Sequence, residues 1–311
     1  MPKRTFIVGT RGSRLALRQT EIALDALRSA NPEAAFETHT IKTSGDQSTA
    51  SLSEIGGRGV FVIEIERALL AGEIDVAVHS LKDLPSEETD GLSIAGVLPR
   101  EDPRDVLVAR DGMTLADLPA GATVGTGSPR RAVQALALRP DLEVRDIRGN
   151  VDTRIRKVED GDYDAVILAA AGLARLGWLD HATQTFEPEE MLPSVGQGAL
   201  ALQCREDDAE TRALVAPVDD FDTGAAVIAE RAFERRLGGG CAAAIAAYAT
   251  VGRGASLERS PVLLRGFVGE PRGRLLRGEM EGVAAEAEML GVRLAEFLIA
   301  QGAEELLEAP L

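Results

Sequence analysis

Two stretches in the first half of the chain repeat the same order of apolar and polar positions. In the first, a strand-like apolar run at 6–10 leads through a short turn into a helical pattern from Arg14 to about Ser29. In the second, residues 122–126 and 130–138 repeat this order of strand, turn and helix. A serine that suits a helix N-cap precedes each helical pattern, Ser13 in one and Ser128 in the other.

A second pair of similar segments follows in the same order. Residues 72–78 and 161–167 both read as a turn that enters a buried strand. Each carries an aspartate at the same offset, Asp75 or Asp164. Because the two pairs occur in register, the chain is predicted to contain two α/β domains of one kind.

Polar linkers that contain proline mark the expected limits of these domains, at 99–105 and 187–193. The apolar run at 198–204 reads as a strand that returns to the first domain. The chain would then cross between the first two domains twice, and the two crossings would form a hinge. Strand and helix patterns continue to the end of the chain. The predicted limits are 1–99 with 199–217 for domain 1, 104–193 for domain 2, and 222–311 for a small α+β domain 3.

A polar segment at 43–59 lies inside domain 1 and carries glycines near its end. A loop of this length within a compact domain is usually either functional or disordered. The sequence alone leaves both alternatives open, and a lid is one of them.

The net charge and the apolar content of the chain limit the kinds of molecule that it is expected to bind. The chain has 311 residues and a formal net charge of −16, which opposes binding to nucleic acid or to an anionic membrane surface. No uninterrupted apolar run of about 18 residues and no secretory signal are visible, so a cytoplasmic protein is expected. The strong acidity fits either a high-salt host or an ordinary solvated surface.

The two cysteines lie far apart and the three histidines are scattered, so we expect neither a metal site nor a disulfide.

Arginines gather where the predicted strands end. Ligands of open α/β sheets bind beyond the carboxyl ends of the strands, and helix N-termini there favour anions. Arg11, Arg130, Arg131 and Arg148 stand at such ends, which predicts a ligand with several carboxylates or phosphates. The alternative is an ordinary surface salt bridge, which we favour for Arg139 and Arg145.

Other candidate groups are a strand-end pair and one cysteine. Lys82 and Asp83 follow the buried strand at 75–78, where an ionised carboxylate could stabilise a cation or form a local salt bridge. Cys241 follows three glycines, so its thiol should be accessible and could be a nucleophile or an attachment point. His79 and Cys204 are interpreted as packed core residues.

Eight motifs follow one another along the chain: 10–17 (TRGSRLAL), 56–61 (GGRGVF), 79–85 (HSLKDLP), 100–105 (REDPRD), 125–131 (GTGSPRR), 148–151 (RGNV), 192–198 (LPSVGQG) and 239–241 (GGC). Several of these motifs are short, but their shared order is highly specific. In these motifs the chain resembles a known family, the porphobilinogen deaminases, over almost its whole length.

This resemblance implies a fold and a reaction. The fold would comprise two similar α/β lobes like those of type II periplasmic binding proteins, plus a small α+β C-terminal domain that carries the cofactor cysteine. The reaction would join four porphobilinogen molecules head to tail, release four ammonia molecules, and free the product as hydroxymethylbilane. The implied cofactor is a dipyrromethane bound to Cys241 by a thioether, and a monomer is expected.

The resemblance also assigns roles to residues. Asp83 would be catalytic and would stabilise the cation left by loss of ammonia, while the glycine-rich segment would be a lid over the cleft. The residues expected to bind the cofactor are Cys241, Lys82, Asp83, Thr126, Ser128, Arg130, Arg131 and Arg148. Those expected to bind substrate are Arg11, Ser13, Arg14, Arg148, Arg154 and Arg175, and the lid residues are Gly56, Gly57, Arg58 and Gly59.

The chain departs from the family pattern after the cysteine. A Gln-Val-Pro-Ile-Gly-like run is usual there, and this chain has alanines at four of the five positions 242–246. Losing the proline and the glycine changes the backbone preferences beside the attachment point. A competing interpretation is a two-lobed binding protein for an organic anion that performs no catalysis.

Overall fold

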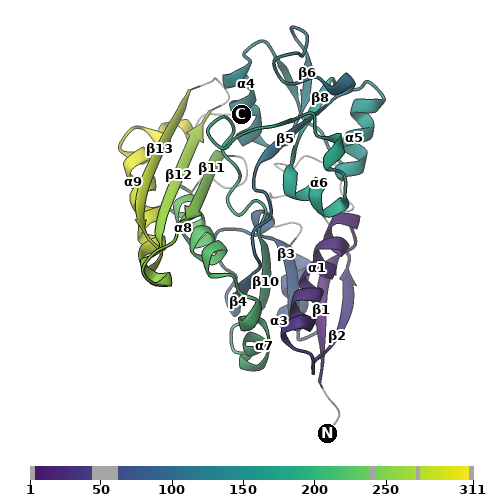
Figure 1. The fold of residues 1–311 in the computed structure, drawn as a ribbon, viewed down its shortest axis with the longest axis vertical. Coiled ribbons are helices and arrows are strands. Elements are labelled where there is room, and N and C mark those ends of the chain that lie inside the picture. Colours follow the sequence, from purple (N-terminus) through teal and green to yellow (C-terminus); the bar gives the residue numbers. More distant parts are fainter. Residues whose placement is uncertain (1–3, 44–61, 239–242, 271–273, 308–311) are drawn as a thin grey trace. The chain divides into compact units, whose positions relative to one another are not determined.

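The computed structural model describes residues 4–43, 62–238, 243–270 and 274–307 (Figure 1). Contacts divide the chain into two compact units. Unit 1 comprises Met1–Glu101 with Ala199–Gly224, and unit 2 comprises Asp102–Gly198 with Ala225–Leu311. The third sheet of the chain is therefore grouped with the second lobe, and the three sets of domain limits stay a prediction.

Unit 1 is built on a five-stranded sheet with the order β2-β1-β3-β10-β4. The central strand β1 runs parallel to both β2 and β3, while β10 is antiparallel to β3 and β4. The predicted return of the chain into the first lobe is thus confirmed. The strands are β1 (Thr5–Arg11), β2 (Ala35–Ile41), β3 (Val76–Ser80), β4 (Leu92–Val97) and β10 (Leu200–Arg205).

Helix α1 (Arg14–Ala30) shows why the first unit folds as its sequence indicates. Its apolar residues recur on one face, so Ala23, Leu24 and Leu27 are buried in the core of the sheet. Ser13 is its N-cap, and the serine hydroxyl accepts the Ala16 N–H at 3.3 Å. Among its described residues, this unit also contains the α-helices α3 (Ile63–Leu70) and α7 (Ala209–Val215).

The first sheet of unit 2 has the equivalent order β7-β6-β8-β5-β9. Strand β6, which corresponds to β1 of unit 1, is flanked by the parallel neighbours β7 and β8, and β5 is antiparallel to β8 as β10 is to β3. The strands are β5 (Asp105–Ala109), β6 (Thr123–Gly125), β7 (Glu143–Arg145), β8 (Ala165–Ala169) and β9 (Gln184–Thr185). The helices are α4 (Pro129–Leu138), α5 (Val151–Glu159) and α6 (Ala170–Leu176).

The repeated aspartates occupy equivalent places in the two sheets. The Asp75 carboxylate accepts the N–H of Ile7 at 2.9 Å, and the Asp164 carboxylate accepts the N–H of Thr123 at 2.8 Å. Both acceptors tie the start of one strand to its parallel neighbour. The internal repeat seen in the sequence is therefore a repeat of structure.

Both repeated strands end in Val-Gly-Thr, at 8–10 and at 124–126, and the shared glycine has a packing reason. A Cβ added at Gly9 would lie 2.3 Å from Ile74 Cδ1, and one added at Gly125 would lie 2.9 Å from Tyr163 Cδ1. Each glycine thus lets the residue before the repeated aspartate pack against the first strand. A side chain at either position would force the two segments apart.

A third sheet, antiparallel and three-stranded, lies in unit 2. Helices α8 and α9 pack on it through a core that includes Phe233, Leu264, Leu290 and Leu294. Strands β11 and β13 were not predicted from the sequence. The elements are α8 (Phe221–Leu237), β11 (Ala244–Val251), β12 (Pro261–Gly269), β13 (Leu275–Val283), α9 (Ala287–Ile299) and α10 (Ala303–Leu307).

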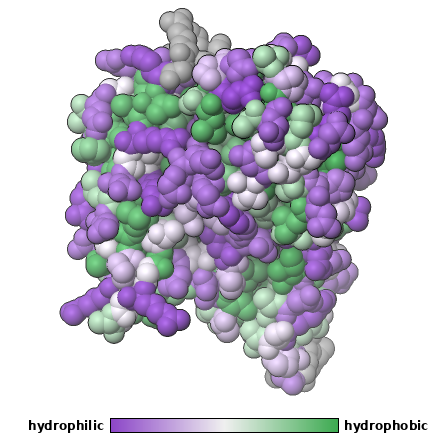
Figure 2. Space-filling view, turned by 45° about the horizontal axis from the view of Figure 1, so that its top comes forward, coloured by the Kyte–Doolittle hydropathy of each residue, from purple (hydrophilic) through white to green (hydrophobic). Residues whose placement is uncertain are grey.

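The described residues also form short 3-10 helices: η2 (Leu81–Asp83), η3 (Arg110–Gly112), η4 (Leu179–His181), η5 (Ala216–Val218), η7 (Leu257–Arg259) and η8 (Ala284–Glu286). The predicted α/β fold class, with two similar lobes and a smaller α+β part, is confirmed. Hydrophilic residues cover much of the face shown in Figure 2, with apolar areas between them. Among the described residues, none of the helices has the length and hydropathy of a membrane span.

Candidate functional site

The structure gathers the predicted site residues of unit 1 at one edge of its sheet. Arg11 is the last residue of β1, and Lys82 and Asp83 lie in η2 directly after β3. Because β1 and β3 are parallel neighbours, their carboxyl ends meet at the same edge. Ser13 and Arg14 begin the helix that leaves this edge.

His79 is packed beside this group, as expected from the sequence. It is buried, and its Nε2 lies 3.0 Å from Gln203 Oε1. The Gln203 amide nitrogen donates to Glu66 at 2.9 Å, so its oxygen is the acceptor and His79 Nε2 donates. Burial lowers the pKa of His79 to about 4, although the Gln203 hydrogen bond and Asp83 act to raise it, and Arg11 also lowers it. The imidazole is therefore neutral near pH 7.

The predicted residues of unit 2 also gather at the carboxyl ends of parallel strands. Thr126 and Ser128 follow β6, while Arg148 follows β7. Arg154 lies in α5, and Arg175 lies in α6, which follows β8. The Thr126 hydroxyl accepts the Ser128 N–H at 3.1 Å. Ser128 occupies the N-cap position of α4 without a side-chain capping bond.

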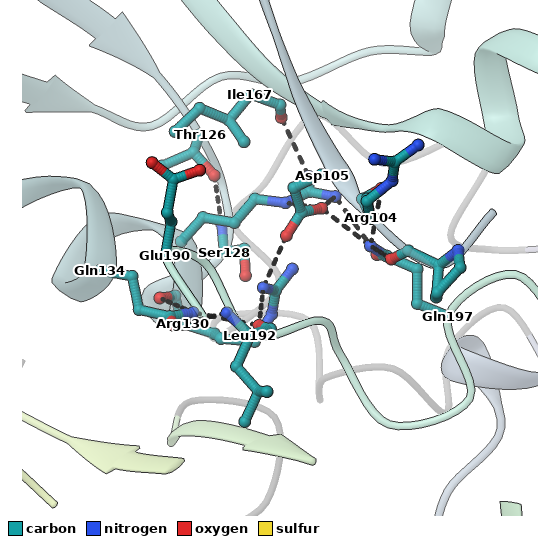
Figure 3. A network of polar contacts seen from close by, with 12 residues as sticks. Arg104, Asp105, Thr126, Ser128, Arg130, Gln134, Ile167, Glu190, Leu192 and Gln197 are labelled. Carbon is teal, nitrogen blue, oxygen red and sulfur yellow. Dashed lines mark hydrogen bonds and ion pairs between the residues drawn. The ribbon is translucent and has the colours of Figure 1, made fainter. Parts of the chain in front are cut away.

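Arg130 and Arg131 lie in the first turn of α4 and share one buried carboxylate, that of Asp105 on β5. Figure 3 shows Asp105 and Arg130 within this network of polar contacts. The distances to Asp105 are 2.7 Å from Arg130 Nη1 and 2.7 Å from Arg131 Nη2. Arg130 also donates to the Leu192 carbonyl at 2.6 Å, and Arg131 to the Ile167 carbonyl at 3.0 Å. Only 4% of Arg130 and 7% of Arg131 are exposed, so the pair is held rigidly.

Asp105 is fully buried, and its charge is set by these neighbours. Burial by itself raises the pKa of Asp105. The charges of Arg130 and Arg131, with hydrogen bonds from Arg130 and Gln197, outweigh that effect and hold the pKa well below its usual range. Asp105 is therefore an anion throughout the physiological range.

The remaining arginines make more exposed contacts. Arg148 Nε donates to Asp146 at 3.1 Å, Arg154 Nε to the Gly149 carbonyl at 2.8 Å, and Arg175 Nη2 to the Gly198 carbonyl at 2.6 Å. Arg139 and Arg145 form salt bridges to Asp141 and Glu143, which confirms the interpretation made for these two. The ligand-binding roles of the first three stay predictions.

Sequence reasoning missed three buried polar residues of unit 2: Asp105, Gln197 and Glu230. Each is fully buried and hydrogen-bonded. Two of them could have been recognised in the sequence, because Asp105 begins an apolar strand and Gln197 stands between two glycines. Glu230 lies inside a helical pattern, where its partners leave no trace in the sequence.

The alanine run after Cys241 has a structural reason. Strand β11 begins at Ala244, and Ala244 and Ala246 are buried in one cluster with Val133, Leu192 and Phe267. The small side chains let β11 pack closely against α4, whose first turn carries Arg130 and Arg131. The strand that starts three residues after Cys241 is thus fixed to the helix that carries the arginine pair.

We expect Ala246→Leu to lower the free energy of unfolding by about 1–3 kcal/mol, because extra methylenes in a tightly packed core displace their neighbours. Chemical denaturation of the variant and the parent measures this difference. The exposed Ala137 of α4 offers a matched control, and Ala137→Leu should change stability little. Equal effects of the two substitutions would contradict the packing argument.

Two predicted parts of the site, Cys241 and the lid residues Gly56, Gly57, Arg58 and Gly59, lie outside the described residues. Among the described residues, no cluster of three or more His, Cys, Asp or Glu side chains could hold a metal ion.

Comparison with known proteins decides the family. Residues 6–213 match the family model "Porphobilinogen deaminase, dipyromethane cofactor binding domain", and residues 225–300 match "Porphobilinogen deaminase, C-terminal domain". The chain belongs to the porphobilinogen deaminase family. Within this family, the chain is 50% identical over 301 residues to the porphobilinogen deaminase of Brevibacillus brevis, which covers 96% of each chain. It is also 50% identical over 306 residues to that of a Roseiflexus species, with 98% of this chain and 99% of the relative covered.

Solved structures with a weaker similarity include two periplasmic proteins. The aliphatic sulphonate binding protein SsuA from Escherichia coli is 17% identical, with a TM-score of 0.41 over 76% of this chain and 70% of its own. The periplasmic binding protein STM4351 from Salmonella typhimurium is 15% identical, with a TM-score of 0.40 over 71% of this chain and 94% of its own.

Proposed function

We propose that this chain is a transferase that condenses four porphobilinogen molecules head to tail into hydroxymethylbilane and releases four ammonia molecules. The observation that carries this proposal is the match to porphobilinogen deaminases over nearly the full length of the chain. The family resemblance inferred from ordered motifs is thereby confirmed. A binding protein without catalysis is not favoured, because these relatives are named as enzymes.

The residues present fit the dipyrromethane cofactor of this family. The cofactor consists of two linked pyrroles with acetate and propionate side chains, so its ligands should be cations and hydrogen-bond donors. Unit 2 places two guanidinium groups, two hydroxyl-bearing residues and a helix N-terminus at the end of one strand. Bound through Cys241, the cofactor would supply the pyrrole ring to which the first substrate is joined.

The roles of this chain's own residues follow from their chemistry. The substrate and the growing chain, with their carboxylates, would be bound by Arg11, Ser13, Arg14, Arg148, Arg154 and Arg175. The cofactor, attached to Cys241, would be bound by Lys82, Asp83, Thr126, Ser128, Arg130, Arg131 and Arg148.

Asp83 would provide the negative charge of the site. Loss of ammonia from a substrate leaves positive charge on that pyrrole, and a fixed carboxylate stabilises it in the transition state. The same carboxylate could accept the proton that the attacked ring loses. The lid at 43–59 would exclude water until the chain is released. We also propose that the enzyme is a cytoplasmic monomer that binds neither nucleic acid nor membrane.

The test is the intact mass of freshly purified protein beside a Cys241→Ser variant. We expect an added mass equal to a dipyrromethane in the parent and its absence in the variant, together with consumption of porphobilinogen by the parent alone. If the parent carries no added mass, porphobilinogen is supplied and the mass is followed with time. A parent that neither acquires the mass nor consumes porphobilinogen would overturn the proposed function.

A further inference from the structure

The segment 192–197 of unit 2 makes hydrogen bonds on both sides. Toward the arginine pair, the Leu192 carbonyl accepts from Arg130, and the Leu192 N–H donates to Gln134 at 2.8 Å. Further along, the Gln197 side chain donates to Asp105 at 2.9 Å and to the Pro103 carbonyl at 2.6 Å. The Gln197 oxygen lies 3.4 Å from Arg131 Nη2. This segment therefore helps to fix the shared carboxylate and both guanidinium groups.

Glu230 holds the same segment from the opposite side. It lies in α8 and is fully buried. One carboxylate oxygen accepts the Gly196 N–H at 2.7 Å, and the other accepts the Ala249 N–H at 2.8 Å. Ala249 belongs to β11, the strand that follows Cys241 in the chain. A single carboxylate thus joins the neighbour of Gln197 to the strand that follows the cysteine.

These contacts form one continuous path through unit 2. It runs from β11 through Glu230 to Gly196, then through the adjacent Gln197 to Asp105, and ends at Arg130 and Arg131. Every side chain on this path is at least nine-tenths buried. Buried groups of this kind keep a fixed geometry because no water can replace a lost partner.

We propose that Glu230 is a positioning residue, which sets the arginine pair in register with the strand that follows Cys241. This inference rests on the proposed function and deepens it, since it explains how the strand after the proposed attachment point and the carboxylate-binding groups are held in a fixed relation to each other. Glu230 itself contacts neither cofactor nor substrate in this scheme. It acts through Gly196 and Gln197.

The chemistry of Glu230 makes the role specific. A carboxylate has two acceptor oxygens and can take both backbone N–H groups. In Glu230→Gln, one oxygen becomes an NH₂ group that faces a backbone donor, so one of the two connections breaks with little change in shape. Asp164→Asn is a matched control, because the Asp164 carboxylate also accepts a backbone N–H, that of the partly buried Thr123 in unit 2, but lies off the path.

The experiment compares the parent, Glu230→Gln, Gln197→Ala, the double variant and Asp164→Asn, all as purified from cells. Three quantities are measured for each: the fraction that carries the cofactor mass, the KM and kcat for porphobilinogen, and the midpoint of denaturant unfolding. We expect Glu230→Gln and Gln197→Ala each to lower the loaded fraction and to raise KM several-fold, with a smaller change in kcat. Asp164→Asn should shift only the unfolding midpoint.

The double variant separates a shared path from two independent effects. Residues that act through one path give a combined change in KM smaller than the product of the two single changes. A multiplicative result, or parental loading and KM in folded Glu230→Gln, would overturn the inference. If Glu230→Gln does not fold, Gln197→Ala with parental loading and KM overturns it alone. A parent that carries no cofactor and consumes no substrate contradicts the proposed function instead, so the two failures are distinguishable.

Discussion

Asp83→Asn is expected to reduce kcat for porphobilinogen by about 10²–10⁴-fold, the range typical for loss of a general acid or base. The substitution keeps the shape of the side chain and removes its negative charge at the carboxyl end of β3. The cation that forms when ammonia leaves would then lack its stabilising anion. Steady-state assays of porphobilinogen consumption, with the loaded fraction checked by intact mass, measure the effect.

Two further measurements test whether the reaction needs the negative charge of Asp83 and not only the shape of its side chain. Asp83→Glu restores the carboxylate with a longer side chain, so it should recover part of the lost rate. The unfolding midpoint of Asp83→Asn should stay near that of the parent, because the side chain is only partly buried. A kcat within about twofold of the parent in fully loaded Asp83→Asn would remove this residue from the catalytic step.

Asp105→Asn is expected to lower the free energy of unfolding by about 3–5 kcal/mol, because it leaves two buried guanidinium groups without their shared carboxylate. Denaturant unfolding of the parent and the variant measures this loss. Asp164→Asn is again the control, since 42% of the Arg110 side chain that pairs with Asp164 is exposed and this ion pair should contribute about 1 kcal/mol or less. Similar losses of unfolding free energy in the two variants would contradict the claim that the buried Asp105 ion pairs stabilise the fold more than the exposed pair does.

The ion pairs of Asp105 with Arg130 and Arg131 also predict how the free energy of unfolding changes with pH. The pKa of Asp105 is held below its unfolded value, so the unfolded state binds the proton first as the pH falls. The stabilisation is complete above about pH 4, the ordinary range of an unfolded aspartate, and is lost as the pH falls further toward the folded pKa. The free energy of unfolding should therefore decrease more steeply below pH 4 in the parent than in Asp105→Asn. Parallel pH profiles would refute this linkage.

Much of the fold was determined locally and could be predicted from the sequence. The repeated Val-Gly-Thr segments, the helix pattern after Ser13 and the aspartates at equal offsets all involve neighbours in the chain or one adjacent strand. The structure gives a reason for each, such as the contact of Gly9 with Ile74. Strands β11 and β13 were missed because an alanine-rich run and a charged run carry no clear strand signal.

The arginines illustrate where sequence reasoning ends. Their places at the ends of parallel strands followed from the pattern of elements, and the structure bears out those places. The environments of these arginines could not be predicted from that pattern. Arg130 and Arg131 are buried on Asp105, whereas Arg148 is partly exposed beside Asp146, yet all three look alike in the sequence.

By itself, the sequence determined the α/β class, the internal repeat and, through ordered motifs, the family. Only the tertiary structure decided that Asp105 binds two arginines and that Glu230 joins Gly196 to Ala249. The physical reason is distance along the chain. Local propensities and strand-end positions are encoded within a few tens of residues, whereas a buried carboxylate is partnered by groups that folding brings together from separate segments.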